Sequence, residues 1–228
     1  RVLRFILRLF IKLTGAIPML LFCKNKIYYS SNLAKKQNKR LKEGAIIVSN
    51  HTSQIDYYSL LLLHPFRVIH TFVGEIVYSL PGLRFLNWIM ENIKIDRRQM
   101  SNAPIQEGLS YLKRKKIVAI FPEGQYESKK GKIQSFKSGA ISLALQSNKD
   151  IIPIYQKGHY HLFRRNRVIV GERINLSKMV DPTLPIEQEI KRLNKYVQNV
   201  MKDLQRQEND FEVAHNGSLF NFYFFWLD

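Results

Sequence analysis

The fold of this chain is decided by the stretch Ala45-Ile46-Ile47-Val48-Ser49-Asn50-His51-Thr52-Ser53-Gln54-Ile55-Asp56. It begins with an apolar run, which is typical of a strand buried on both faces of a parallel sheet. It ends with an imidazole at the mouth of that strand and a carboxylate five residues further on. Five residues of continuous helix turn through about 500°, so the two side chains meet best if His51 lies in the loop and Asp56 in the first turn of the next helix. There the carboxylate holds one ring nitrogen and leaves the other as a proton acceptor, so His51 is a candidate general base.

Apolar runs of strand length alternate with longer helical patterns along the rest of the chain. The expected strands are Ala45–Ser49, Val68–Val73, Ile93–Ile95, Ile117–Phe121, Ile151–Tyr155 and Val168–Val170. The expected helices are Leu33–Glu43, Gln54–Leu63, Leu83–Glu91, Pro104–Lys113, Ser138–Gln146 and Ile186–Arg206. This alternation predicts a single α/β domain with a mostly parallel or mixed sheet flanked by helices. In such sheets ligands gather at the carboxyl ends of strands, where His51 falls.

Charge and cysteine content limit the partners of the chain. The 228 residues contain 36 Lys and Arg against 18 Asp and Glu, for a net charge of +18. Such an excess indicates an anionic partner: a nucleic acid, an anionic membrane or a phosphorylated substrate. The single cysteine, Cys23, excludes an intramolecular disulfide and a Cys-based zinc site, and fits a reducing compartment.

The basic excess is concentrated near the N-terminus, where it alternates with large aliphatic residues. Residues 1–50 hold eleven Lys and Arg and one acid. Arg1, Arg4, Arg8 and Lys12 recur at helical spacing and form one cationic face beside a broad apolar one. This pattern favours an interfacial helix on an anionic leaflet. The alternative is a helix packed on the protein's own core with its basic face solvated. The longest charge-free run here, residues 13–23, is shorter than the ~20 residues of a membrane span.

Further polar residues follow other expected strands. Glu123 lies between Pro122 and Gly124 after the strand at 117–121, in a tight loop beside the same sheet edge as His51. Lys137 precedes small residues that open a helix, a place suited to an anion. Arg97 follows the strand Ile93–Ile95, and its guanidinium suits a phosphate group.

Together these segments resemble the glycerolipid acyltransferase family, whose best-known members are the 1-acylglycerol-3-phosphate acyltransferases. The resemblance runs from about residue 44 to residue 155, in the family's order. It is carried by His51 and Asp56 of a His-x4-Asp motif, Ile95-Asp96-Arg97, Phe121-Pro122-Glu123-Gly124, Phe136-Lys137-Ser138-Gly139-Ala140 and Ile151-Ile152-Pro153-Ile154. The apolar strand with Pro153 at its middle suits a sheet edge or a pocket wall better than a central position.

The resemblance implies an O-acyltransferase without an acyl-enzyme. We expect no cofactor besides the thioester co-substrate. We also expect no metal, because His159 and His161 have a metal-like spacing but no nearby acid or Cys that would complete a site. His51, oriented by Asp56, would activate the hydroxyl of a lysophospholipid for attack on an acyl-CoA or acyl carrier protein thioester. The acceptor implied first is 1-acylglycerol-3-phosphate, which would give phosphatidic acid. Arg97, Glu123, Gly124 and Lys137 would bind its head group.

Two departures from the family pattern leave the acceptor open. The family continues the Phe-Pro-Glu-Gly motif with Thr-Arg-Ser, whereas this chain reads Gln125-Tyr126-Glu127-Ser128. The family also often carries a Lys before the Glu that follows the next strand, and Val73-Gly74-Glu75 lacks it. Because the missing guanidinium is a phosphate ligand in the family, another lysolipid or a non-phosphorylated hydroxyl is the alternative. Arg98, Lys129, Lys130 or Lys137 could compensate for it.

The chain is accordingly divided into a membrane-associating helical segment (1–32), an acyltransferase domain (33–210) and an aromatic C-terminal tail (211–228). The tail either inserts into the membrane interface or folds back on the core. We expect a peripheral or monotopic protein on the cytoplasmic face of a membrane, with anionic lipids as partners and no nucleic acid. A non-catalytic basic module would explain the charge, but it leaves the ordered motifs without a function.

Overall fold

The computed structural model describes residues 3, 4, 6–8, 10, 25–53, 55–64, 67–96, 98, 101–124, 133–158, 160 and 165–224, with side chains up to residue 211. The strands are β1 (Asn25–Tyr29), β2 (Ala45–Ser49), β3 (Ile69–Gly74), β4 (Ile93–Ile95), β5 (Ile117–Ile120), β6 (Ile151–Gln156) and β7 (Asn166–Val170). The helices are α2 (Asn32–Asn38), α3 (Asp56–Leu63), α4 (Glu75–Ser79), α5 (Leu83–Met90), α6 (Ala103–Lys113), α7 (Gly139–Ser147), the short 3-10 helix η1 (Leu176–Lys178) and α8 (Ile186–Phe224).

The strands form one seven-stranded sheet in the order β1-β7-β6-β2-β5-β3-β4. Strands β6, β2, β5, β3 and β4 run parallel to one another. Strand β7 is antiparallel to β6, and β1 pairs in parallel with β7 at the edge. The predicted α/β domain with a mostly parallel sheet is therefore confirmed, and β2 lies at the centre of the sheet.

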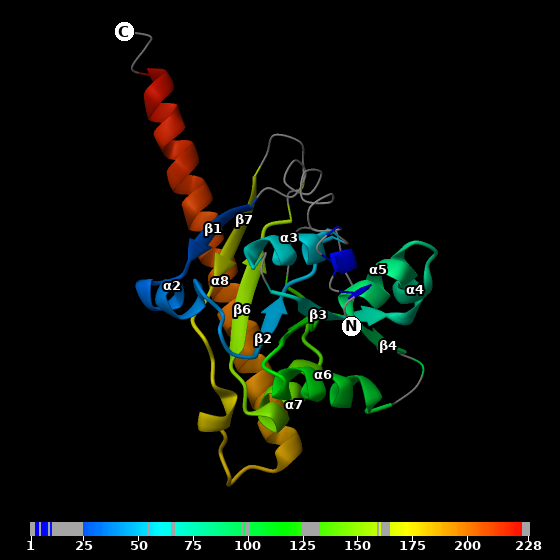
Figure 1. Cartoon of the computed structure of the whole chain (residues 1–228). Coiled ribbons are helices and arrows are strands. Elements are labelled where there is room, and N and C mark those ends of the chain that lie inside the picture. The colour runs from blue at the N-terminus through cyan, green and yellow to red at the C-terminus, as the bar shows by residue number, and fades with distance from the viewer. Residues whose placement is uncertain are drawn as a thin grey trace.

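Helices cover both faces of the sheet (Figure 1). The side chains of β2 alternate between the two cores that result. Ile46 and Val48 pack into a core with residues of α6, α7 and α8, whereas Ala45 and Ile47 join the opposite core with Leu60 of α3. All five residues of β2 are buried. An apolar strand without polar alternation is what burial on both faces requires.

Strand β6 is interior, so the expectation that Pro153 marks an edge strand is wrong. Pro153 pairs with Val48 on one side, and on the other its carbonyl accepts a hydrogen bond of 2.8 Å from the backbone N–H of Gly171. Proline has no N–H to return to the Gly171 carbonyl. The buried amide of Asn38 donates to that carbonyl instead, at 2.9 Å. The side chain at the end of α2 thus replaces the missing ladder bond.

Two expected boundaries differ from the structure. Strand β1 lies within the first 32 residues, but it pairs with β7 and so belongs to the same sheet as the strands that follow it. Helix α8 continues from Ile186 to Phe224 without a break at residue 211, and its last turns project beyond the rest of the protein (Figure 1). Residue Phe211 on α8 stacks on Tyr28 of β1, with ring centroids 5.0 Å apart.

The N-terminal helical residues turn their arginines toward the protein. Arg4 and Arg8 each form an ion pair of 2.8 Å with Glu91, and the Arg4 guanidinium lies 4.5 Å from the centroid of the Trp88 ring. The opposite side carries exposed apolar side chains, Leu3, Ile6 and Phe10. The expectation of a cationic face directed at an anionic leaflet is therefore wrong for these two arginines, because both point to Glu91 of the protein itself. Arg1 and Lys12 lie outside the described residues.

Candidate active site

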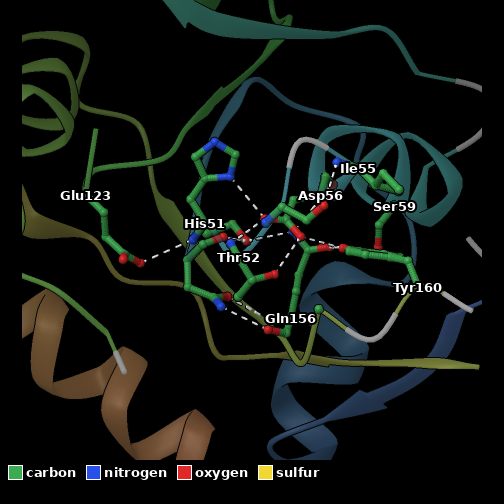
Figure 2. Close-up of polar contacts among 12 residues, drawn as sticks. His51, Thr52, Ile55, Asp56, Ser59, Glu123, Gln156 and Tyr160 are labelled. Carbon is green, nitrogen blue, oxygen red and sulfur yellow. Dashed lines mark hydrogen bonds and ion pairs between the residues drawn. The ribbon is translucent and has the colours of Figure 1, made fainter. Parts of the chain in front are cut away.

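His51 and Asp56 lie in contact, as their spacing in the sequence predicts. His51 lies in the loop after β2, and Asp56 is the first residue of α3. The His51 Nδ1 atom is 3.0 Å from Asp56 Oδ2, and the Asp56 side chain is fully buried (Figure 2). Phe121 stacks on the imidazole with centroids 4.5 Å apart. Because Nδ1 faces the carboxylate, the tautomer with its proton on Nδ1 leaves Nε2 as the basic nitrogen.

The Asp56 carboxylate is held by more groups than His51 alone. Its Oδ2 atom accepts hydrogen bonds from the backbone N–H groups of Thr52, at 2.6 Å, and Ser53, at 2.8 Å. Its Oδ1 atom accepts from the Thr52 hydroxyl at 3.0 Å and from the Tyr160 hydroxyl at 2.6 Å. With His51, five donors converge on a carboxylate that offers about four lone-pair positions. This saturation fixes the carboxylate in one orientation and holds the loop 51–53 against it.

Hydrogen bonds between two side-chain amides and the backbone join the carboxyl ends of β2 and β6 next to His51 and Asp56. The Asn50 side chain donates to the Gln156 carbonyl at 2.9 Å and accepts from the Gln156 backbone N–H at 2.7 Å. The Gln156 side chain in turn donates to Ser49 Oγ at 3.0 Å. Asn50 and Gln156 are both buried. Buried polar groups that are fully paired rigidify their surroundings, so His51 leaves the sheet from a fixed point.

Glu123 contacts the backbone of His51. One carboxylate oxygen accepts from the His51 N–H at 3.2 Å (Figure 2). The other accepts from the Gln134 N–H at 3.4 Å. The residue is almost fully buried. These contacts connect the loop after β5 to the loop after β2. They give Glu123 a bracing role that its motif did not predict, while its role at the head group stays a prediction.

We predict that Glu123 makes stability depend on pH. Burial raises the pKa of Glu123, while the hydrogen bonds from the His51 and Gln134 N–H groups oppose that shift. The folded protein therefore keeps this proton at pH values where the unfolded chain has lost it. The associated stability is complete below the ordinary carboxyl pKa and is lost as pH rises through the raised pKa.

Denaturant unfolding between about pH 4 and about pH 7 measures this effect in the wild type and in Glu123→Gln. The stability advantage of the wild type should shrink as pH rises, because glutamine does not titrate. The matched control is Glu187→Gln, which changes an exposed carboxyl in the first turn of α8. A wild-type advantage that stays constant across this range would contradict the prediction.

The structure places Gly124 and Lys137 together. Gly124 has a φ of +74°, and a Cβ atom at this position would lie 3.0 Å from Nζ of Lys137. The Lys137 backbone N–H also donates to the Pro122 carbonyl at 2.8 Å. An ammonium group therefore lies against the turn after β5, close to Glu123. Arg97, the other predicted head-group residue, lies outside the described residues, as do Lys129 and Lys130.

The described part of the chain contains no group of three His, Cys, Asp or Glu side chains that could hold a metal ion. None of its helices has both the length and the apolar character needed to cross a bilayer.

Several contacts of the site were not predicted. The contact of Ser53 could have been predicted, since the pattern Ser-x-x-Asp before a helix is close to a capping box. In the structure the Ser53 hydroxyl accepts from the Ile55 N–H at 3.2 Å. No sequence pattern indicates the contacts of Gln156 and Tyr160 with Asp56. They follow Asp56 by about a hundred residues, and only the pairing of β6 with β2 brings them to it.

Residues 30–157, more than half of the chain, match the family model described as Acyltransferase. A 1-acyl-sn-glycerol-3-phosphate acyltransferase of Limnanthes douglasii is 28% identical over 166 residues, which cover 72% of this chain and 58% of the relative. One from Cocos nucifera is 30% identical over 160 residues, 68% of this chain and 51% of the relative. The human 1-acyl-sn-glycerol-3-phosphate acyltransferase beta is 28% identical over 134 residues, 57% of this chain and 48% of the relative.

These matches span only about half the length of the curated relatives. Among solved structures, the fold is similar to the crystal structure of the 1-acyl-sn-glycerophosphate (LPA) acyltransferase PlsC from Thermotoga maritima. The TM-score is 0.63 at 20% sequence identity, with 90% of this chain and 81% of the other covered. At this identity the likeness concerns the fold.

Proposed function

The chain belongs to the acyltransferase family, and we propose that it transfers a fatty acyl group from a thioester donor to the hydroxyl of a lysophospholipid. The observation that carries the proposal is the contact of 3.0 Å between His51 Nδ1 and Asp56 Oδ2, formed at the carboxyl end of the central strand. It gives the site an oriented general base. The donor is an acyl-CoA or an acyl carrier protein thioester.

In the proposed reaction, Nε2 of His51 takes the proton of the acceptor hydroxyl as its oxygen attacks the thioester carbonyl. The tetrahedral intermediate collapses, the carbon–sulfur bond breaks, and the new ester forms. The departing thiolate takes the proton from the imidazolium, so His51 returns to its starting state. The Asp56 carboxylate stabilises the imidazolium between the two proton transfers. No Ser or Cys nucleophile is required, because the acyl group moves directly to the acceptor.

We take 1-acylglycerol-3-phosphate as the first acceptor, which would yield phosphatidic acid. The names of the sequence relatives support this choice. Lys137 supports it too, since its ammonium lies against Gly124 and offers a cation to a phosphate group. Our proposed head-group site consists of Arg97, Glu123, Gly124 and Lys137.

A different lysolipid is the second candidate, and a specific observation favours it. Gln125 and Tyr126 stand where the family has Thr and Arg, and Gly74 stands where it often has Lys. Lys94 on the neighbouring strand β4 lies opposite Val73, but its ammonium forms an ion pair of 2.6 Å with Glu75. Two cations that would recognise a phosphomonoester are therefore replaced, and Lys94 is already neutralised.

The test is an acyl-transfer assay with purified protein, labelled acyl-CoA or acyl carrier protein, and a panel of lysolipids. Transfer to 1-acylglycerol-3-phosphate in preference to lysophosphatidylcholine and lysophosphatidylethanolamine supports the first acceptor. Transfer only to acceptors without a phosphomonoester supports the second. Absence of transfer to every acceptor with either donor overturns the proposed function and favours a binding module.

We further propose that the protein sits on the cytoplasmic face of a membrane through the apolar side of its N-terminal helix. Leu3 and Ile6 are 62% and 55% exposed on this side. The neighbouring helix α5 adds the exposed rings of Phe85 and Trp88, which stack on each other. Arg4 bridges the two helices by its contacts with Trp88 and Glu91. Exposed aliphatic and aromatic side chains in one area are what an interfacial surface requires.

The double variant Leu3→Glu/Ile6→Glu should weaken vesicle binding at least tenfold, because burying each aliphatic side chain is worth about 1.5–3 kcal/mol. Sedimentation with vesicles of phosphatidylcholine and phosphatidylglycerol measures it. The matched control is Ile186→Glu, an equally exposed residue (64%) at the start of α8. Equal vesicle binding by both variants would show that the N-terminal helix does not contact the membrane.

A further inference from the structure

The connection between β6 and β7 brings a tyrosine to the catalytic pair. Tyr160 lies three residues beyond the stretch that matches the family model. Its hydroxyl is 2.6 Å from Asp56 Oδ1 and 3.3 Å from Gln156 Oε1 (Figure 2). A phenol has one proton to donate, and the shorter contact to a charged acceptor is the stronger one. The hydroxyl therefore donates to Asp56.

A close backbone approach supports this contact independently. Gly158 has a φ of +78°, and a Cβ atom at this position would lie 2.0 Å from Thr52 Oγ1. Only glycine fits there, so the chain after β6 runs directly against the loop that carries His51. The same Thr52 hydroxyl is the second donor to Asp56 Oδ1. The turn at Gly158 thus brings Tyr160 and Thr52 to one oxygen.

The two oxygens of Asp56 have different partners. Oδ2 receives His51 and the two backbone N–H groups of the adjacent loop, all within five residues of Asp56. Among the described residues, Oδ1 accepts hydrogen bonds from hydroxyl groups, those of Thr52 and Tyr160. A donor on Oδ1 prevents rotation of the carboxylate about its Cβ–Cγ bond, and this rotation would carry Oδ2 away from the imidazole. Tyr160 therefore acts on the orientation of His51 without touching it.

We propose that Tyr160 is a positioning residue of the acyl-transfer site, which holds the Asp56 carboxylate in the orientation that aligns His51. Its role in catalysis rests on the proposed function, whereas its effect on the His51–Asp56 hydrogen bond does not. The hydroxyl group, rather than the ring, carries the effect. Tyr160 lies outside every segment of the family resemblance.

The experiment compares Tyr160→Phe with Tyr155→Phe. Tyr155 is a matched control because its buried hydroxyl accepts from the Gln205 amide of α8 at 3.3 Å and has no contact with Asp56. The first readout is the proton NMR resonance of His51 Nδ1–H in the substrate-free protein, assigned by its loss in His51→Ala. The second is steady-state acyl transfer. Thermal unfolding checks that both variants fold.

We expect Tyr160→Phe to shift or broaden the Nδ1–H resonance and to lower kcat about tenfold with unchanged KM for donor and acceptor, since hydrogen bonds to charged groups are worth about 1.5–3 kcal/mol. Tyr155→Phe should change neither. Thr52→Val/Tyr160→Phe, which removes both donors to Oδ1, should lower kcat further.

A Tyr160→Phe protein with the wild-type resonance and kcat overturns the inference, even if the wild type is an active acyltransferase. A change in KM alone also overturns it, because it would place Tyr160 at the substrate. If the wild type transfers no acyl group but the resonance moves in Tyr160→Phe only, the positioning contact is supported and the proposed function fails.

Discussion

The variant His51→Ala is expected to lower kcat/KM for acyl transfer by about 10²- to 10⁴-fold, the usual contribution of a general base. In the proposed reaction this imidazole takes the proton of the acceptor hydroxyl. Stability should change little, by about 1 kcal/mol or less, since the net value of one hydrogen bond is of that size. Asp56 keeps its four other donors when the imidazole is removed.

The acyl-transfer assay and denaturant unfolding measure the two parts of this prediction. His64→Ala is the matched control, because His64 lies just beyond the other end of α3 and away from Asp56. Burial lowers the pKa of His64 to about 4, so the control also removes a neutral imidazole near pH 7. If His51→Ala kept activity within a few-fold of His64→Ala, the general-base assignment would be rejected.

The sequence predicted the centre of the fold well because its signals there are local. The run Ala45–Ser49 is apolar without interruption, and its observed limits as β2 are the predicted ones. The meeting of His51 and Asp56 followed from helical geometry alone. Both features depend on residues within twelve positions of one another.

The features that were missed depend on distant partners. Strand β1 is short and partly exposed, and it is stabilised by pairing with β7, 141 residues further along the chain. Pro153 looked like an edge residue because the amide that replaces its hydrogen bond comes from Asn38. The orientation of the N-terminal helix was decided by Glu91, which attracts Arg4 and Arg8. None of these partners can be identified from periodicity.

Glu123 also shows the difference between a local sequence signal and a contact with a distant partner. Its motif placed it correctly at the sheet edge beside His51, because the loop after β5 is adjacent to the loop after β2. Its contacts are set by two backbone N–H groups, which have no sequence signature. A motif therefore predicts where a residue lies better than it predicts which atoms the side chain binds.

Asp56→Asn is the second prediction with a large expected effect, a loss of about 10²- to 10⁴-fold in kcat. The asparagine amide can direct its NH2 group toward Thr52 and Tyr160, since hydroxyl groups accept as well as donate. Its carbonyl then still accepts from the loop N–H groups, and the geometry survives. What is lost is the negative charge that stabilises the imidazolium when His51 takes the proton.

Asp56→Ala separates this electrostatic effect from the structural one. Alanine leaves the buried N–H groups of Thr52 and Ser53 without their acceptor, at about 1–3 kcal/mol each. It should therefore be clearly less stable than Asp56→Asn in denaturant unfolding, while both are equally inactive. If Asp56 acts only through His51, the double variant His51→Ala/Asp56→Asn is no slower than His51→Ala. Losses that multiply in the double variant would instead give Asp56 a role in catalysis that does not pass through the imidazole.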